Sequence, residues 1–448
     1  MVKNTARPKG RAWVVAADMG YGHQRPAAAL AFLAPDEVVL TANRYDGIPA
    51  SDRTTWRRLE SFYYFASRLA GKGFLGAAAF RTFDYFQRIR PYYPLRRSSG
   101  EASPLRHDEA PTLQLRNTYR LIRRGWGRHL IIERLAERPI PLITTFATVA
   151  FMAEEWGYPG PIYAVVTDAD ISRAWAPLHP GRTRIQYCAS TDRSAARLLS
   201  YGVPAGNIHH TGFPLPPELV GRGSVVAQRS LAARLTRLDP SGRYRLRYGS
   251  LVAEHLGEQA AKLNRNGMPL TVVFAIGGAG AQVEIGAKLV RALKSLIVER
   301  KLSLHLVAGT SKSVAEELYA AVRAEGIASY LGDTIVVDLA ATKDEYFTAF
   351  NKLLVTADIL WTKPSELSFF VALGIPVIIA PPIGSQEVQN RKWLTYLGAG
   401  IDQLPPHLAH EWLPDLLTSG RLAEAAMNGF VNADRGGTEA IARLIPAE

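Results

Sequence analysis

The chain has 448 residues, of which 47% are hydrophobic and 21% are charged, a globular composition that excludes a disordered or fibrous chain. This length exceeds one ordinary core and predicts two domains. The longest apolar runs cover about ten residues, too few for a membrane-spanning helix of roughly 20. The basic N-terminus runs directly into an apolar segment without a cleavage site, so we expect no signal peptide. A single cysteine, Cys188, excludes a disulfide framework and favours a reducing compartment.

Basic residues are concentrated in one part of the chain. The formal net charge is +13, from 53 Lys and Arg against 40 Asp and Glu. Residues 51–135 contain 17 basic and 7 acidic residues, and residues 56–97 hold 12 of the 42 aromatic residues. A basic surface of this kind attracts nucleic acid, an anionic membrane or a phosphorylated substrate. The aromatic residues could instead form the core of an inserted helical subdomain.

Short apolar strands alternate with helices along the first half of the chain. A glycine turn follows the first strand, and a polar loop is expected at 98–111. A proline-rich joint at 211–217 marks the predicted domain boundary. The expected strands are 12–17, 142–145, 162–167 and 187–190. One helix is expected to start near Arg25, and two others are expected at 115–138 and 192–201.

The second half shows a cleaner alternation after a basic helical stretch. This pattern predicts parallel, doubly wound sheets, and hence an α/β protein with two Rossmann-like domains facing across a cleft. The N-terminal domain covers 1–215, with an aromatic–basic helical insertion at about 50–138, and the C-terminal domain covers 216–448. The expected strands are 271–276, 304–308, 334–338, 359–361 and 377–380, and the expected helices are 283–300, 314–325 and 345–357.

The first candidate site follows the first strand, in the sequence DMGYGH at 18–23. Gly20 and Gly22 allow a sharp backbone turn, and the following helix offers free N–H groups. Ligands of such sheets lie beyond the carboxyl ends of the strands, which places His23 at the rim of a cleft. An imidazole there can take a proton from an attacking hydroxyl near neutral pH. The alternative is a histidine that caps a helix or packs in the core.

The second candidate is IGGAGAQ at 276–282, between a strand and a helix. Gly277, Gly278 and Gly280 allow a phosphate to approach the backbone at the helix N-terminus. No Lys-Ser/Thr pair follows, so this is not a P-loop. A tight turn needed only for strand–helix packing is the alternative.

Two further turns carry polar groups. PPIGSQEVQN at 381–390 offers Gln386, Glu387 and Asn390, whose directional donors and acceptors suit sugar or ribose hydroxyls. The sequence DAD at 168–170 follows a strand and could bind a divalent cation. A carboxylate of Asp168 that orients a histidine or hydroxyl is at least as well supported.

These motifs resemble the family 28 glycosyltransferases of the GT-B class, nearest to the branch of monogalactosyldiacylglycerol synthases and diacylglycerol glucosyltransferases. The resemblance runs from about residue 12 to 401, with 50–138 and 219–269 unmatched. It rests on eight motifs in one order: DMGYGH with RPA, VVTD, TGFPLPP, IGGAGAQ, LVAGTSK, ADILWTKP, LGIPVII and IGSQEVQN.

The resemblance implies inverting transfer of a sugar from a nucleotide diphosphate sugar, commonly UDP-linked, to a lipid such as diacylglycerol. It makes His23 the base that deprotonates the acceptor and places Asp168 on the acceptor side. It assigns the remaining positions to the donor: Gly277, Gly278, Gly280, Gln386, Glu387 and Asn390. No cofactor or bound metal is implied, because helix dipoles and backbone amides can stabilise the leaving diphosphate.

Two positions depart from the family pattern. The segment after TKP is short, so Glu366 takes the ribose-binding role there, and Ser385 replaces the glycine before Gln386. Both departures lie on the donor side, so the resemblance does not identify the nucleotide and the sugar.

The aromatic–basic segment then has a physical interpretation. Aromatic rings favour the membrane interface, and each basic residue near an anionic surface adds about 1 kcal/mol. We therefore expect a cytoplasmic enzyme that is peripherally associated with the inner face of the membrane. The alternatives are a soluble acceptor, a nucleotide-sugar 2-epimerase and, ranked last, a nucleic-acid-binding protein. The expected docking residues are Trp56, Arg57, Arg58, Phe62, Tyr63 and Tyr64.

Overall fold

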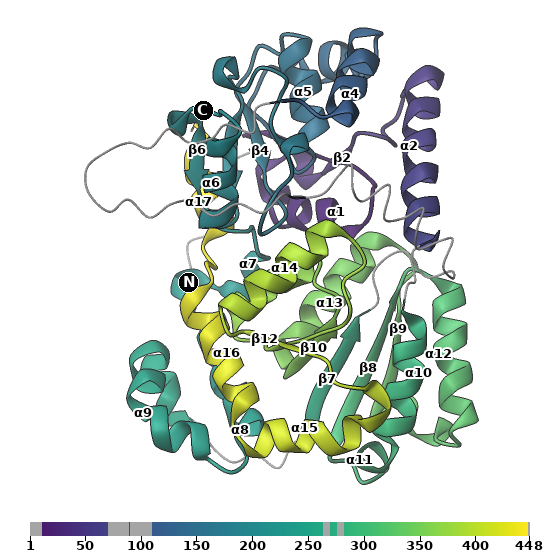
Figure 1. The fold of residues 1–448 in the computed structure, drawn as a ribbon, viewed down its shortest axis with the longest axis vertical. Coiled ribbons are helices and arrows are strands. Elements are labelled where there is room, and N and C mark those ends of the chain that lie inside the picture. Colours follow the sequence, from purple (N-terminus) through teal and green to yellow (C-terminus); the bar gives the residue numbers. More distant parts are fainter. Residues whose placement is uncertain (1–10, 70–88, 90–109, 263–268, 276–281, 447–448) are drawn as a thin grey trace. The chain divides into compact units, whose positions relative to one another are not determined.

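A computed structural model describes residues 11–69, 89, 110–262, 269–275 and 282–446 of the chain (Figure 1). The chain forms two compact units. The first contains residues 1–216, 384–389 and 436–448, and the second contains 217–383 and 390–435. The predicted division assigned everything after 215 to the second domain, whereas in the structure the C-terminal residues belong to the first unit.

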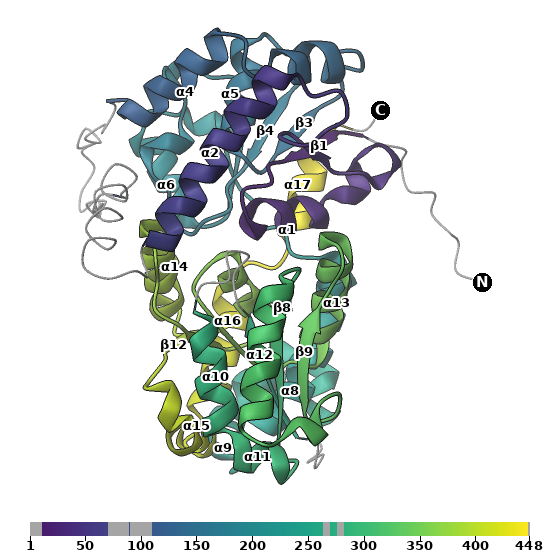
Figure 2. The same ribbon diagram turned by 90° about the vertical axis from the view of Figure 1, so that its right-hand side faces the viewer.

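The first unit is built on six parallel strands in the order β2-β1-β3-β4-β5-β6. Figure 2 shows β3 between β1 and β4. Val15 of β1 pairs with Leu40 of β2 on one side and with Thr144 of β3 on the other. The order reverses between β1 and β3, so this is the switch point at which such sheets bind ligands. The strands are β1 (Trp13–Ala16), β2 (Leu40–Thr41), β3 (Leu142–Thr144), β4 (Ile162–Val165), β5 (Gln186–Ala189) and β6 (Ile208–His210).

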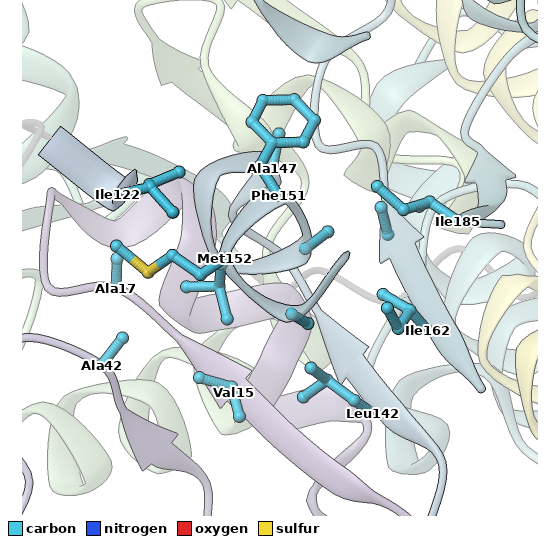
Figure 3. Packing of buried hydrophobic residues seen from close by; sticks show 14 of the residues in the cluster. Val15, Ala17, Ala42, Ile122, Leu142, Ala147, Phe151, Met152, Ile162 and Ile185 are labelled. Carbon is cyan, nitrogen blue, oxygen red and sulfur yellow. The ribbon is translucent and has the colours of Figure 1, made fainter. Parts of the chain in front are cut away.

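Each face of this sheet has its own core. On one face Val15, Leu142 and Ile162 pack against helix α5 (Ala147–Glu155), whose Phe151 and Met152 are buried (Figure 3). Successive residues of a strand point to opposite faces, so Val14 and Ile143 enter the other core. That second core includes residues of the C-terminal helix α17 (Gly437–Leu444).

One expected helix is interrupted. The predicted helix 115–138 is wrong as a single element, because α4 (Leu113–Arg123) ends before Gly125 and a π-helix covers His129–Leu135. Gly125 and Gly127 have φ angles of +109° and +81°, which residues with a side chain rarely adopt. A Cβ at Gly127 would also meet the side chain of Met152, so the turn between the two helices requires glycine at this position. The remaining helices of this unit are α1 (Tyr21–Ala29), α2 (Ala50–Leu69) and α6 (Asp192–Ser200).

The second unit is also a parallel six-stranded sheet, in the order β12-β11-β10-β7-β8-β9. Counted from its own first strand, this is the 3-2-1-4-5-6 order of a Rossmann fold, with the switch point between β7 and β10. The strands are β7 (Leu270–Ala275), β8 (Leu302–Gly309), β9 (Ile335–Leu339), β10 (Ile359–Thr362), β11 (Val377–Ile379) and β12 (Gly400–Asp402).

A buried arginine joins a helix of this unit to the segments that precede strands β10 and β11. Arg234 of α8 (Val225–Leu238) is 1% exposed and donates to the carbonyls of Ala357 and Leu373, at 2.6 and 3.0 Å. Burial lowers the pKa of its guanidinium to about 10, so it stays charged at neutral pH. The other helices are α7 (Pro217–Val220), α9 (Arg243–Leu256), α10 (Val283–Ala292), α11 (Lys294–Val298), α12 (Lys312–Ala324), α13 (Lys343–Thr356), α14 (Ser385–Tyr396), α15 (Ala409–Thr418) and α16 (Arg421–Asn432).

The two parallel sheets confirm the predicted fold class of two Rossmann-like domains. The cleft between them and the insertion beyond α2 stay predictions. The short strands β2, β6 and β12 had no counterpart in the sequence pattern, because two or three partly exposed residues make no apolar run. Among the described residues, no helix combines the length and apolarity needed to cross a membrane.

Candidate functional site

His23 lies at the switch point of the first sheet. It stands in the first turn of α1, directly after β1, and its ring Nδ1 is 2.7 Å from the carbonyl oxygen of Thr145. Thr145 follows β3, so this contact spans the two strands between which the strand order reverses. The ring also meets Phe146 edge to face, with ring centroids 4.9 Å apart.

The Thr145 contact sets the chemistry of the ring. A carbonyl oxygen only accepts, so Nδ1 carries the proton and donates it, and Nε2 of the neutral ring keeps its lone pair. Desolvation by burial lowers the pKa of His23 to about 4, although the Thr145 carbonyl acts in the opposite direction. The ring is therefore neutral at physiological pH, with Nε2 as its basic nitrogen.

Asp18 anchors the loop that precedes His23. It is 5% exposed, and its carboxylate accepts from Gln24 Nε2 at 2.6 Å and pairs with Arg44 Nε at 2.8 Å. Its own N–H donates to Asn43 Oδ1 at 2.8 Å. These contacts join the β1–α1 loop to the residues that follow β2.

The two glycines of this loop have different roles. Gly20 has a φ angle of +104° and immediately precedes α1, so the predicted glycine turn is located there. Gly22 is a residue of the first helical turn, so its expected role as a second turn glycine is wrong. The helix begins at Tyr21, four residues before the predicted start near Arg25.

The two aspartates after β4 also differ. The buried carboxylate of Asp170 accepts two hydrogen bonds from Arg197, from Nε at 2.8 Å and from Nη2 at 2.7 Å. It accepts a third from Arg193 Nε at 3.1 Å. Two arginines therefore occupy its carboxylate, which makes Asp170 a packing residue. Asp168 is half-buried, and its carbonyl accepts from Ser190 Oγ at 2.7 Å. Since β3 lies between β1 and β4, Asp168 and His23 share one edge of the sheet.

In the second unit, polar turns gather at the carboxyl ends of β7, β10 and β11. Thr362, the last residue of β10, donates from Oγ1 to the carbonyl of Ala275, the last residue of β7, at 3.0 Å. Gln282, at the N-terminus of α10, donates from Nε2 to the carbonyl of Pro381 at 2.8 Å. The predicted donor glycines, Gly277, Gly278 and Gly280, lie outside the described residues.

Of the other predicted donor residues, Glu366 and Asn390 lie in the second unit, whereas Gln386 and Glu387 lie in the segment 384–389 of the first unit. Glu366 is 8% exposed and follows the turn after β10. Asn390 is fully buried, and its Nδ2 donates to the carbonyl of Pro364 at 3.0 Å, so it fixes that turn. Gln386 and Glu387 are half-buried in the first turn of α14. No cluster of three potential metal ligands occurs in the described part of the chain.

The expected docking residues do not form one exposed surface. Trp56 is 2% exposed and packs edge to face on Trp126 at 4.8 Å between ring centroids, so its assignment as a docking residue is wrong. The sequence gives no sign of this, because a helix can bury an aromatic residue between exposed arginines. Arg57 and Arg58 are exposed on α2. The side chains of Phe62, Tyr63 and Tyr64 lie outside the described part of α2.

Sequence reasoning did not identify three residues that hold the site. Thr145 orients His23, while Asn43 and Arg44 hold Asp18. The position of Thr145 directly after an apolar strand, in LITTF, was the available signal. Residues 43 and 44 follow β2, and a strand of two residues leaves no recognisable pattern.

Comparisons with known proteins agree with the resemblance that the ordered motifs indicate. A family model described as a domain of unknown function, DUF6938, matches residues 251–334. The chain is similar to the processive diacylglycerol beta-glucosyltransferases of Bacillus thuringiensis and Bacillus cereus, 24% identical over 270 residues. The match covers 59% of this chain and 56% of each relative, so the chain spans just over half the length of these curated relatives.

Solved structures with a related fold include MurG of Acinetobacter baumannii, at 15% identity and a TM-score of 0.42. The matched region covers 74% of this chain and 77% of MurG. A UDP-GlcNAc 2-epimerase from Neisseria meningitidis is 13% identical with a TM-score of 0.42, over 73% of this chain and 80% of the epimerase.

Proposed function

We propose that this chain is an inverting glycosyltransferase that moves a sugar from a UDP-linked donor to a lipid acceptor such as diacylglycerol. The observation that carries the proposal is the neutral His23 ring, held by Thr145 at the switch point with Nε2 as its basic nitrogen. Similarity to the diacylglycerol beta-glucosyltransferases gives this base its reaction and its substrates.

In the proposed reaction, His23 Nε2 takes the proton of the acceptor hydroxyl while the acceptor oxygen attacks the anomeric carbon of the sugar. The bond between that carbon and the diphosphate oxygen breaks, and UDP leaves with the electron pair. Attack opposite the leaving group inverts the anomeric centre. Asp168, on the same sheet edge, acts on the acceptor side.

The second unit binds the donor in this proposal. The diphosphate would bind at its glycine turn, which contains Gly277, Gly278 and Gly280. This turn precedes the N-terminus of α10, where backbone N–H groups favour an anion. Glu366 and Asn390 of this unit would serve the ribose and the sugar. The same role is proposed for Gln386 and Glu387, which belong to the segment 384–389 of the first unit. Backbone amides and the helix dipole supply the charge stabilisation that the leaving diphosphate needs, so the proposed chemistry requires no metal.

We place the reaction at the inner face of the cytoplasmic membrane, with the enzyme peripherally bound. Support comes from the local basic excess of residues 51–135 and from the exposed Arg57 and Arg58 of α2. Arginines near an anionic surface contribute about 1 kcal/mol each. With Trp56 assigned to the core, this charge attraction is the main described contribution to docking.

The test uses purified protein, vesicles of anionic lipid containing diacylglycerol, and radiolabelled UDP-glucose, UDP-galactose and UDP-N-acetylglucosamine. We expect label from one donor to move into the organic phase. His23→Ala should lower this turnover by about 10²-fold or more, the usual contribution of a general base, while donor binding is retained. His179→Ala, which alters an exposed histidine of the same unit, is the matched control.

The alternative functions give different products. Label released as free sugar in the absence of acceptor would favour an epimerase or hydrolase and overturn the proposal. Label transferred only to added soluble acceptors would overturn the lipid assignment and keep the glycosyltransferase. Full turnover in His23→Ala would remove the base.

A further inference from the structure

The first unit contains a cavity to which the reaction just described assigns no ligand. A cavity of about 370 Å³ lies between the loop after β2 and one face of α2. The α2 residues on it are spaced by three or four positions, so they share one side of the helix. The lining consists of residues 43–48 from the loop and Arg53, Trp56, Arg57 and Glu60 from α2.

Three guanidinium groups line this cavity, from Arg44, Arg53 and Arg57. Arg44 uses its Nε for Asp18 at 2.8 Å, and Arg53 donates from one terminal nitrogen to the Ile48 carbonyl at 3.4 Å. Each guanidinium has five N–H donors, so these contacts leave further donors on both side chains. The planar arginine fork matches the oxygens of a phosphate group.

The rest of the lining suits a hydroxylated molecule. Trp56 and Tyr45 are 2% and 6% exposed, and the Tyr45 hydroxyl is 2.9 Å from His129 Nδ1, so both rings are held in place. Because both rings are almost fully buried, they support the wall of the cavity and leave contacts with a ligand to the polar side chains. Asp46 and Glu60 add carboxylate groups that can accept from hydroxyls. Asn43 is 4% exposed, and its amide is bonded to Asp18 and Glu60.

We propose that this cavity binds the phosphate-bearing polyol group of the acceptor. The arginines hold the phosphate, and the carboxylates of Asp46 and Glu60 accept from the hydroxyls. The assignment of the occupant to the acceptor rests on the glycosyl transfer proposed above. Among the lipid acceptors proposed above, it favours those whose head is a phosphorylated polyol over neutral diacylglycerol. A free phosphorylated polyol is the other source of the same chemistry.

The contacts of Arg44 connect this cavity to the loop that carries His23. Arg44 lines the cavity and pairs with Asp18, and Asp18 also accepts from Gln24, the residue after His23. A phosphate bound by Arg44 would therefore be connected to the β1–α1 loop through the Arg44 side chain, which pairs with Asp18 of that loop. The cavity is placed to hold one end of the acceptor while another part of it reaches the base.

Binding is measured first without donor, by isothermal titration of sn-glycerol 3-phosphate into the full chain, with glycerol as the uncharged reference. Arg57→Gln should weaken binding of glycerol phosphate about tenfold or more, because it removes a charge-assisted hydrogen bond. Arg116→Gln, an exposed arginine of α4 away from the cavity, should change it less than about twofold. Equal effects of the two substitutions, or equal affinity for glycerol, would overturn the proposal.

Vesicles of phosphatidylglycerol in phosphatidylcholine distinguish the two sources of the ligand. If the occupant is a lipid head, Arg57→Gln should reduce vesicle binding more than Arg58→Gln, and glycerol 3-phosphate should compete. If it is a free phosphate, the two variants should bind vesicles equally while the titration difference persists. If the protein transferred sugar to no acceptor but Arg57→Gln still weakened binding of glycerol 3-phosphate more than Arg116→Gln did, the glycosyltransferase function alone would be overturned.

Discussion

His23 and Thr145 are joined by two hydrogen bonds that run in opposite directions. The ring Nδ1 of His23 donates to the Thr145 carbonyl at 2.7 Å, and Thr145 Oγ1 donates to the His23 carbonyl at 2.6 Å. One bond fixes the tautomer of the ring, and the other ties the first turn of α1 to the end of β3. Because the partner of Nδ1 is a backbone atom, a side-chain substitution at 145 leaves that bond possible.

This separation of roles makes Thr145→Val informative. Valine keeps the volume but removes the donor to the His23 carbonyl, which should cost about 1–3 kcal/mol of unfolding free energy. We expect turnover to fall about tenfold because the base shifts relative to the acceptor, with the KM for the donor unchanged. Chemical denaturation and steady-state kinetics measure both effects.

Thr145→Ser is the matched control, since it retains the hydroxyl. It should recover most of the lost turnover. If serine and valine were equally slow, the defect would come from packing, and the second hydrogen bond would have no role in placing the base.

The low pKa of His23 predicts an unusual pH dependence. Desolvation by burial lowers its pKa to about 4, below the ordinary value of 6.5. A base must be neutral to act, so kcat/KM should stay level as the pH falls from 7 to 5 and decline only near 4. An acid limb with a midpoint between pH 6 and 7 in the pH profile would contradict this.

The same shift affects stability in a defined direction. Between pH 6.5 and 4 the unfolded chain binds a proton at His23 that the folded chain does not, so the free energy of unfolding falls as the pH falls through this window. Urea denaturation at pH 7 and pH 5 should show a larger loss in the wild type than in His23→Gln.

Asn390 should contribute to donor binding through the turn that it holds. Its buried Nδ2 donates to the Pro364 carbonyl at 3.0 Å. Asn390→Leu leaves this carbonyl without that donor and should lower the free energy of unfolding by about 1–3 kcal/mol. We expect the KM for the nucleotide sugar to rise with a smaller change in kcat. Gln389→Leu, at the partly exposed neighbour, is the control.

Trp56 should behave as a core residue in any assay. Trp56→Ala removes a ring packed on Trp126 and Phe146 and should cost about 3–5 kcal/mol, measured by urea unfolding. The folded fraction should bind anionic vesicles as the wild type does, whereas Arg58→Gln should bind them more weakly at low salt. Unchanged stability in Trp56→Ala would contradict the packing described.

The sequence predicted the long buried strands well, because each is a mostly apolar run bounded by turn residues. It also placed His23 directly after β1. It could not provide the strand order, and therefore could not reveal that Thr145 would meet His23, since 122 positions separate the two residues. Only the order β2-β1-β3 brings their strands together.

The errors share a physical cause in the surroundings of each residue. Trp56 has exposed arginines as sequence neighbours, but the helix turns its ring towards Trp126. Gly22 looks like a turn residue beside Gly20, yet the helix has already begun. For Trp56 a tertiary contact decided the outcome, and for Gly22 the early start of the helix did.

The return of the C-terminus to the first unit has a consequence for how the protein can be divided. Ile441 and Ile445 complete the core beneath Val14, and Tyr163 donates to the Leu444 carbonyl at 2.9 Å. Thr438 donates to the Leu215 carbonyl. A fragment that stops at residue 216 would therefore expose an apolar strip along its sheet, and a stop codon a dozen residues early would damage the half of the protein that is made first (Figure 1). The core of the first unit can therefore be completed only after the last helix has been synthesised.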